Sequence, residues 1–442
     1  MTSASERCMT GLLALSSLVA ASAHATLPIE QWQTTSGARV LFVETHDLPM
    51  LDIAVDFPAG SSRDAPEKSG VASLTLALMR SGAGAYGEDE ISERLASVGA
   101  DLSGRFDVDR AGYGLRTLSS ARERNEALGL LRLVLQKPTF PQKTFEREQQ
   151  RTLAGLREAE TRPEILADRE FRHLLYGDHP YSQRGSGEVE TVAKIRREDL
   201  VEFYRGYFAA RDAVVSIIGD LTRSEAGAIA EQLTTGLNRN SQMLPVLPPV
   251  ALLQAAKTSR ITHPATQAHI LVGQPGIKRM DPDYFPLFLG NYILGGGGFA
   301  SRLNDEIRQK RGYAYSTYSY FNPLALEGPF QIAVQTKKET AEDALKVARD
   351  TLAKFVAEGP TPEELDAAKQ NIIGGFPLRI DSNKKILDYL SIIGFYRLPL
   401  TYLEDFPAQI ERLTLDQIKD AWRRRIHPER MATVVVAGAD LP

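Results

Sequence analysis

The chain is almost free of cysteine: among its 442 residues, Cys8 is the only one. It lies in an N-terminal segment in which an apolar run, residues 11–21, is followed by the small-residue site Ala23-His24-Ala25. This order predicts a secretory signal peptide over residues 1–25. The mature chain then has no thiol, which excludes disulfides, a cysteine nucleophile and thiolate metal ligands. We therefore expect a periplasmic or secreted protein.

Long apolar runs and an excess of charge of one sign are also lacking. The N-terminal apolar run is shorter than the roughly 20 residues that a bilayer-spanning helix needs, and no other segment approaches that length. The formal net charge of −4 gives no reason to expect binding to nucleic acid or to anionic lipid. We expect a soluble protein whose partners are proteins or peptides, with no nucleic acid and no membrane.

What the chain does contain is a pattern that occurs twice. A β-branched run ends in glycine at residues 211–219 and again at 430–438, nearly half the chain apart. Between the two runs, three prolines within residues 245–249 break the periodicity and push the residues before them toward extended geometry. We expect two homologous domains joined by a linker, with the boundaries 26–240, 241–260 and 261–442.

Local signals predict a mixture of helices and strands. The alternation over residues 51–57 predicts a half-buried strand. A Ser or Thr three residues before a Glu or Gln predicts a helix start at four places, which are Ser120–Glu123, Thr222–Glu225, Thr361–Glu364 and Thr414–Gln417. Long helices between separated strands indicate an α+β fold.

The second half carries a run of four glycines, which are Gly295, Gly296, Gly297 and Gly298. A phosphate cradle is disfavoured, because the Gly-Lys-Ser/Thr ending of a nucleotide loop is missing and Phe299 stands in its place. Downstream lie Arg308 and Tyr315. Taken alone, these residues also allow a purely structural interpretation, in which Arg308 pairs with Asp305 or Glu306 and Tyr315 packs on a strand.

The glycine run, the spacing Arg308-x-x-x-Gly-x-x-Tyr315 and their place in the second half together resemble the C-terminal domain of pitrilysin/insulinase-type zinc metallopeptidases. The resemblance implies that Arg308, Tyr315 and the glycine loop 295–298 bind the backbone of a peptide substrate. Arginine offers several fixed donors to carbonyl oxygens, and a phenol adds another. The resemblance also implies two α+β domains, each a mainly antiparallel sheet flanked by helices, that form half of a clam-shell.

The same resemblance places the family's zinc helix at residues 70–82, where the pattern His-x-x-Glu-His should stand. The three chemical positions are Ser73, Leu76 and Ala77 in this chain. Neither imidazole is present to bind zinc, and no carboxylate is present to activate a zinc-bound water. We therefore expect no metal and no cofactor in this chain.

The third metal ligand of the family, a glutamate eight residues before a proline, falls on Gly155. Glu148 and Glu158 lie nearby but out of register. The histidines of the mature chain form no His-x-x-x-His pair; they are His46, His173, His179, His263, His269 and His427. We expect His179, in a Gly-Asp-His-Pro turn, to be structural, and Ser73 not to be a nucleophile because no base lies at a recognised motif spacing.

The resemblance therefore implies a non-catalytic subunit of a bacterial two-subunit peptidase. We expect it to hold an extended peptide for hydrolysis by a zinc-bearing partner chain in a heterodimer, with zinc in that partner. The alternative is a structural or peptide-binding relative with no part in proteolysis.

Overall fold

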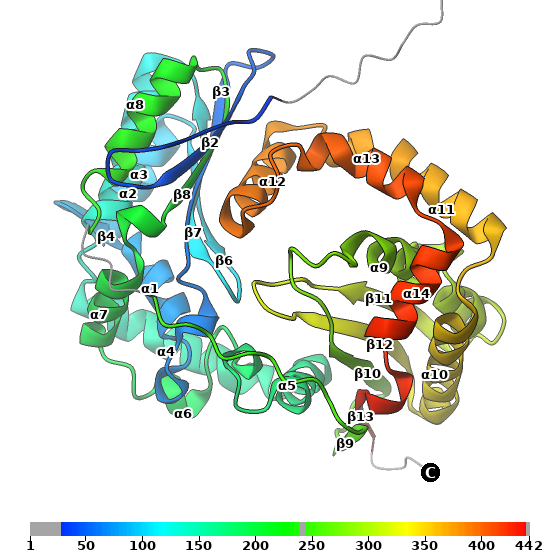
Figure 1. Ribbon diagram of the computed structural model, residues 1–442. Coiled ribbons are helices and arrows are strands. Elements are labelled where there is room, and N and C mark those ends of the chain that lie inside the picture. Colours follow the sequence, from blue (N-terminus) through cyan, green and yellow to red (C-terminus); the bar gives the residue numbers. More distant parts are fainter. Residues whose placement is uncertain (1–27, 239–243, 439–442) are drawn as a thin grey trace, which may run out of the picture.

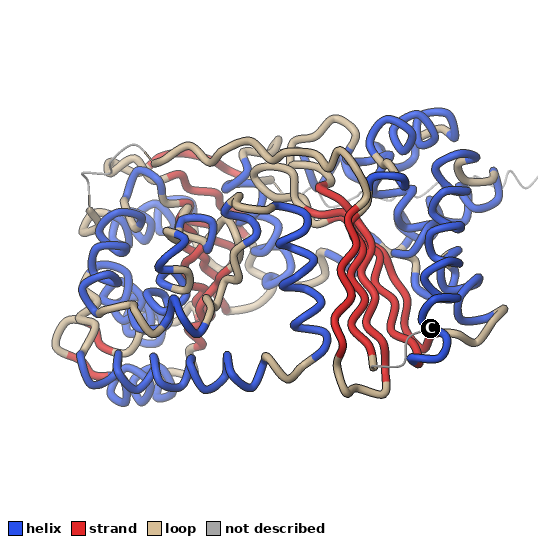
Figure 2. Tube along the Cα trace, turned by 90° about the horizontal axis from the view of Figure 1, so that it is seen from below, coloured by secondary structure: helices blue, strands red, loops and turns tan. Residues whose placement is uncertain are grey.

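The computed structural model describes residues 28–238 and 244–438, and it shows two halves that are each built on one β-sheet (Figure 1). The predicted signal peptide lies outside the described residues. Figure 2 shows the two sheets standing apart, with helices around and between them. The α+β fold with two homologous domains, predicted from the sequence, is confirmed in the following elements.

The N-terminal sheet has six strands in the order β1-β2-β8-β3-β7-β6. All neighbouring strands are antiparallel except β2 and β8, which are parallel. The strands are β1 (Glu30–Gln33), β2 (Arg39–Glu44), β3 (Met50–Phe57), β6 (Asp101–Phe106), β7 (Ala111–Leu118) and β8 (Val214–Gly219). A short hairpin, β4 (Gly82–Ala83) and β5 (Tyr86–Gly87), stands apart from this sheet.

The C-terminal sheet repeats this connectivity in the order β11-β12-β10-β13-β9. Its strands are β9 (Lys257–Thr262), β10 (Gln267–Pro275), β11 (Ala314–Phe321), β12 (Pro329–Lys337) and β13 (Ala432–Ala437). The two runs that end in glycine are β8 and β13, and each lies between a parallel and an antiparallel neighbour. The shared connectivity supports duplication of one unit.

Helices flank both sheets. Those of the first half are α1 (Val71–Met79), α2 (Glu88–Ser97), α3 (Ala121–Gln136), α4 (Gln142–Ala159), α5 (Pro163–Tyr176), α6 (Val189–Val192), α7 (Arg197–Tyr207) and α8 (Arg223–Thr234). Those of the second half are α9 (Tyr284–Asn291), α10 (Ala341–Glu358), α11 (Pro362–Gly374), α12 (Asn383–Tyr396), α13 (Tyr402–Arg412) and α14 (Leu415–Arg425). In the part of the chain that the structure describes, none of them is long and apolar enough to cross a bilayer.

The four predicted helix starts are the N-caps of α3, α8, α11 and α14. Capping boxes form at Thr222, Thr361 and Thr414, where each hydroxyl accepts a bond from the amide three residues on. Ser120 differs, because its hydroxyl donates to the Glu123 carboxylate at 2.5 Å and caps no amide. Local sequence is sufficient to place these helix ends.

The two halves exchange helices. In sequence α12 belongs to the second half, yet it packs on β2, β3 and β8 of the N-terminal sheet, while α5 of the first half packs on β10 and β13. Both helices lie between the sheets in Figure 1. The contact of α12 is close: a Cβ added to Gly394 would lie 2.6 Å from side-chain carbons of both Leu41 and Val214. The halves are therefore interlocked, and the domain boundaries drawn from the sequence remain a proposal.

Strand β3 shows what this exchange changes. The sequence predicts a half-buried strand, and this is wrong, because every residue from Leu51 to Phe57 is buried. Helix α12 covers the face that the alternation assigns to solvent. On that face Asp52 pairs with Arg116 at 2.8 Å, and Asp56 accepts a 2.5 Å hydrogen bond from Ser391 of α12. Buried carboxylates are tolerated when they are paired in this way.

A second contact between the halves is centred on the buried Asp109, in the turn between β6 and β7. Its carboxylate accepts hydrogen bonds from the hydroxyls of Tyr181 and Tyr396, both at 2.9 Å, and from the amide of Ala325 at 2.7 Å. Two of these donors belong to the second half of the chain. Burial raises the pKa of Asp109, and the three donors oppose that rise.

Asp283, which precedes α9, joins that helix to the end of α14. Its carboxylate accepts two 2.8 Å bonds from Arg424 and one of 2.7 Å from Arg425. The hydrogen bonds from Arg424, opposed by burial, and then the bond from Arg425 lower the pKa of Asp283 to about 2 from its ordinary value of 3.8. A carboxyl group whose pKa is lower in the folded state stabilises the fold above its unfolded pKa and loses that contribution as the pH falls.

We therefore expect the free energy of unfolding to fall between about pH 4 and pH 2, and to fall less steeply in Asp283→Asn. Urea titrations across this range, followed by circular dichroism, measure both slopes. The exposed Asp366→Asn on α11 is the matched control and should keep the wild-type slope. Equal slopes in wild type and Asp283→Asn would contradict the assignment.

Candidate functional site

The glycine run forms a tight turn against β11. Helix α9 continues into a π-helical turn, η5 (Tyr292–Gly296), and a short 3-10 turn, η6 (Gly298–Ala300), follows. A Cβ at Gly295 would lie 2.6 Å from the backbone nitrogen of Ser319, so a side chain does not fit there. Gly298 has φ +61, a left-handed conformation that favours glycine. These glycines therefore allow the turn to approach β11 and bring Phe299 out of the core.

Arg308 lies on the next π-helical turn, η7 (Asn304–Gln309), between two aromatic rings. The guanidinium carbon is 4.6 Å from the centre of the Phe299 ring and 5.4 Å from that of the Tyr315 ring. Both aromatic side chains are well exposed, Phe299 at 68% and Tyr315 at 83%. The guanidinium therefore lies over both rings, and cation–π contacts of this kind do not consume its N–H donors.

The structural interpretation of Arg308 is wrong. Asp305 pairs with Lys310 at 2.7 Å, and Glu306 pairs with Lys310 at 2.7 Å and with Arg311 at 2.6 Å. Within the described residues, Arg308 makes no ion pair and no side-chain hydrogen bond. Its donors are therefore not taken up by a neighbouring carboxylate.

Tyr315 does not pack into the sheet either. The pairing of β11 with β12 shifts register between Ala314 and Ser316, which makes Tyr315 the extra residue of a β-bulge. A bulge turns one side chain away from the regular alternation of a strand. This bulge directs the Tyr315 ring onto Arg308, so the predicted pair is brought together with Phe299 as a third member. The contact of Phe299 with Arg308 was not predicted from the sequence, where its only signal is an aromatic residue directly after the glycine run.

The positions that correspond to the zinc helix lie on α1. The Ser73 hydroxyl donates to the carbonyl of Gly70 at 3.1 Å, Leu76 is buried facing Gly104 of β6, and Ala77 is exposed. Gly155 is exposed on α4, with no atom within 4 Å of a Cβ built on it. Across residues 28–238 and 244–438, no three His, Cys, Asp or Glu side chains are grouped so that they could hold a metal ion.

Glu148 and His179 have other partners, whereas Glu158 is exposed on α4. Glu148 is buried on α4 and binds Arg147 at 3.0 Å and Arg151 at 2.6 Å. The Nδ1 atom of His179 accepts a 3.0 Å bond from the amide of Tyr181, and its Nε2 atom lies 2.8 Å from the carbonyl of Pro248. His179 is therefore structural, as predicted, and it holds Pro248 of the predicted linker against the first half.

A buried carboxylate at the start of α1 was missed by the sequence analysis. Asp64 accepts bonds from the amides of Gly70 at 2.6 Å and Ala72 at 2.9 Å, which caps the helix. Burial raises the pKa of Asp64 to about 7, although both amide bonds favour the ionised form. The carboxyl group precedes the helix by several residues, a spacing that no local capping pattern predicts. It holds α1 in place without any metal.

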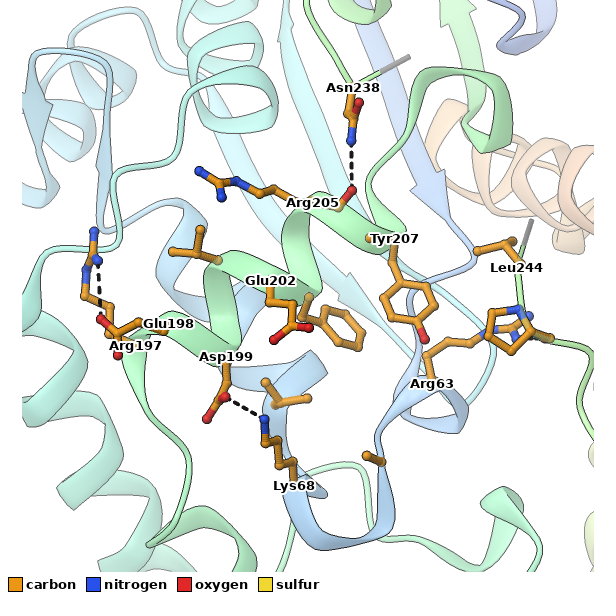
Figure 3. Close-up of a pocket in the computed structure, with 16 residues that line it drawn as sticks. Arg63, Lys68, Arg197, Glu198, Asp199, Glu202, Arg205, Tyr207, Asn238 and Leu244 are labelled. Atoms are coloured by element: carbon orange, nitrogen blue, oxygen red, sulfur yellow. Dashed lines mark hydrogen bonds and ion pairs between the residues drawn. The ribbon is translucent and has the colours of Figure 1, made fainter. Parts of the chain in front are cut away.

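A cavity of about 710 Å³ opens beside the start of α1 (Figure 3). Its bases and acids are interspersed: Lys68 pairs with Asp199 at 2.6 Å, and Arg63 donates to the carbonyl of Pro245 at 2.5 Å. Burial raises the pKa of Tyr207, which also lines the cavity. The lining has no marked excess of either charge, in contrast to the cavity beside the glycine turn described below.

In comparisons with known proteins, each half of the chain matches a profile of peptidase family M16. The family profile described as insulinase (peptidase family M16) matches residues 39–183, and that described as peptidase M16 inactive domain matches residues 194–372. The chain is 28% identical over 385 residues to the non-peptidase homolog YmxG of Helicobacter pylori, covering 86% of this chain and 87% of that protein.

Solved structures agree with this grouping. A peptidase M16 inactive domain from Pseudomonas fluorescens is 38% identical, with a TM-score of 0.90, and the match covers 93% of this chain and 98% of that one. The periplasmic protease PqqL from Escherichia coli is 16% identical and shares the fold, with a TM-score of 0.78 over 93% of this chain and 46% of that one.

Proposed function

Because this chain belongs to the insulinase (M16) family of peptidases, we propose that it is a non-catalytic subunit that holds an extended peptide for a zinc-bearing partner chain. The observation that carries the proposal is the Arg308 guanidinium, which is held between Phe299 and Tyr315 with its donors unused. Those donors suit the carbonyl oxygens of a peptide, and the Tyr315 hydroxyl adds one more.

The position of the pair suits an extended peptide. Strand β11 is an edge strand, which pairs with β12 alone among the described residues. An edge strand leaves main-chain donors and acceptors free where nothing covers it, and extended peptides bind such edges by adding a strand. In β11 the carbonyl of Ser319 is already taken, because it accepts a 3.1 Å bond from Asn291. A peptide aligned with β11 would run past Tyr315 and meet the Arg308 donors.

Catalysis would come from the partner. Helix α1, which carries the zinc-helix positions, and strand β11, which carries Tyr315, lie in different halves of the molecule (Figure 1). Ser73, Leu76 and Ala77 offer no ligand set, so the partner would supply the metal, the attacking water and the general base. This chain would contribute orientation, which lowers the barrier by converting an encounter into a fixed geometry. We therefore infer a heterodimer in which zinc is bound by the other chain.

The same proposal places the protein outside the cytoplasm. Residues 1–25 have the order of a signal peptide, and PqqL, which shares the fold, is a periplasmic protease. Both the predicted signal peptide and the location of PqqL are consistent with a peptide substrate in the periplasm or outside the cell.

Mixing the purified chain with a zinc-bearing M16 relative tests the proposal. We expect neither zinc in stoichiometric amount nor hydrolysis of a quenched fluorescent peptide from this chain alone, and we expect turnover in the mixture above that of the partner alone. Metal analysis and fluorescence measure the two quantities. If the chain binds peptide and the mixture gains no turnover, the structural or peptide-binding alternative is supported instead.

A further inference from the structure

A cavity of about 340 Å³ lies beside the glycine turn and is distinct from the Arg308–Tyr315 pair. It is bounded by α9, by the end of β11 and by the 3-10 turn η9 (Phe376–Arg379), and Gly296 forms part of its wall. Its charged lining residues are two arginines, Arg279 and Arg379, and no carboxylate lines it. The cavity therefore carries positive charge of its own.

Neither arginine is neutralised by a neighbour. Within residues 28–238 and 244–438, neither Arg279 nor Arg379 makes an ion pair, whereas Arg424 and Arg425 on α14 both bind carboxylates. The Nε atom of Arg279 is buried without a hydrogen-bond partner, and its guanidinium carbon lies 5.3 Å from the centre of the Tyr396 ring. An unpaired buried donor of this kind costs free energy until an acceptor binds.

The rest of the lining is aromatic and suited to a partly desolvated anion. Tyr284, Phe288, Tyr292 and Phe321 contribute their rings. The Tyr292 hydroxyl donates to Asn371 at 2.6 Å, so it is occupied, and burial raises the pKa of that phenol while the charge of Arg379 opposes the rise. Aromatic walls lower the local dielectric and strengthen any charge-assisted hydrogen bond to the arginines.

The cavity lies along the same strand as the predicted peptide site. Tyr315 stands at the start of β11, and Ser319 and Tyr320, which line the cavity, stand near its end. A strand rises about 3.3 Å per residue, so the five residues from Tyr315 to Tyr320 span roughly 17 Å. A peptide that follows β11 would reach the cavity about five residues from the bond that Arg308 holds.

We propose that this arginine cavity binds a carboxylate of the peptide, either an Asp or Glu side chain or the C-terminal carboxylate. The proposal rests on the proposed function for the placement of the peptide, and the cavity supplies the chemistry. Arginine forms planar, two-bond contacts with carboxylates, and two unpaired arginines in one cavity favour such an anion over a neutral amide. The substrate class is thus an extended peptide with an acidic group near one end.

Direct binding to the purified chain tests this without catalysis. Fluorescein-labelled peptides that differ only by Glu or Gln five residues from a central bond, on either side, are titrated by anisotropy, each with a free and an amidated C-terminus. We expect the Glu or free-carboxylate form to bind about tenfold or more tightly than its neutral counterpart, as charge-assisted hydrogen bonds imply. Loss of the preference on amidation identifies the C-terminal carboxylate; loss on Glu to Gln identifies the side chain.

Variants complete the test. Arg379 is exposed, so Arg379→Ala should fold and remove the preference, Arg379→Lys should keep part of it, and Arg279→Gln should weaken it. The exposed Arg412→Ala on α13 makes the same charge change as Arg379→Ala outside the cavity and should leave the preference intact. Equal binding of acidic and neutral peptides, or a preference that survives both cavity substitutions, would overturn the proposal.

The two proposals fail separately. Arg308→Ala should weaken the binding of acidic and neutral peptides by the same factor and leave the ratio of their affinities unchanged. If acidic and neutral peptides bind equally well while Arg308→Ala still weakens binding, the arginine cavity is refuted and the proposed function stands. If the preference for acidic peptides persists while Arg308→Ala changes neither binding nor hydrolysis by the pair, the proposed function is refuted and the arginine cavity stands.

Discussion

Replacing Arg308 by alanine is expected to lower kcat/KM of the assembled pair by about tenfold to a hundredfold. The reason is that a hydrogen bond to a charged group contributes roughly 1.5–3 kcal/mol, and the guanidinium between Phe299 and Tyr315 has no other use among the described residues. Stability should hardly change, because the side chain makes no ion pair there. Peptide hydrolysis by the mixture, together with a thermal unfolding curve of the variant, measures both.

Companion variants make that result specific. Tyr315→Phe keeps the ring on Arg308 and removes only the hydroxyl, so we expect a loss of roughly two- to tenfold, as for one neutral hydrogen bond. Lys310→Ala, nearby on the surface, changes the charge equally but removes only exposed ion pairs, and it should leave turnover unchanged. Turnover unaffected by both Arg308→Ala and Tyr315→Phe would remove the proposed role.

Asp109→Ala is expected to lower the free energy of unfolding by roughly 2–5 kcal/mol, because each buried donor left without an acceptor costs about 1–3 kcal/mol. The substitution leaves the hydroxyls of Tyr181 and Tyr396 and the amide of Ala325 without their acceptor. Because these donors span the two halves, we also expect the single unfolding transition to broaden or divide. Urea unfolding followed by circular dichroism and tyrosine fluorescence reports both effects.

Two controls accompany the Asp109 variant. Asp109→Asn keeps the shape and one acceptor oxygen, so it should cost less than the alanine substitution. Asp366→Ala on the exposed face of α11 should stay within about 0.5 kcal/mol of wild type. An Asp109→Ala protein as stable as the Asp366 control would show that the network does not join the halves.

Retention of α1 without zinc ligands has a physical explanation. Its residues Val71, Ala72, Leu74 and Leu76 belong to the core of the first half, and Asp64 caps its start. A helix that fills a core is kept by packing, because its removal would leave a cavity. Loss of the metal chemistry therefore does not require loss of the helix.

The sequence alone determined which zinc ligands are missing. Ligand types are set by residue identity, so Ser73, Leu76 and Ala77 are sufficient to exclude the zinc pattern, and the Arg308–Tyr315 spacing predicts a peptide-binding pair. Capping boxes at Thr222, Thr361 and Thr414 were predicted correctly because they depend on contacts within four residues. The repeated run ending in glycine revealed the duplication that the two sheets share.

Only the tertiary structure decided the features that join residues far apart in the chain. Burial of both faces of β3 depends on α12, whose Ser391 lies 335 residues beyond its partner Asp56. The contact of the Tyr315 ring with Arg308 depends on a β-bulge in β11 that no local sequence pattern predicts. The unpaired state of Arg279 and Arg379 is likewise a property of their surroundings. Local sequence fixes propensities and residue types, whereas burial, pairing and the absence of a partner depend on which distant segments pack together.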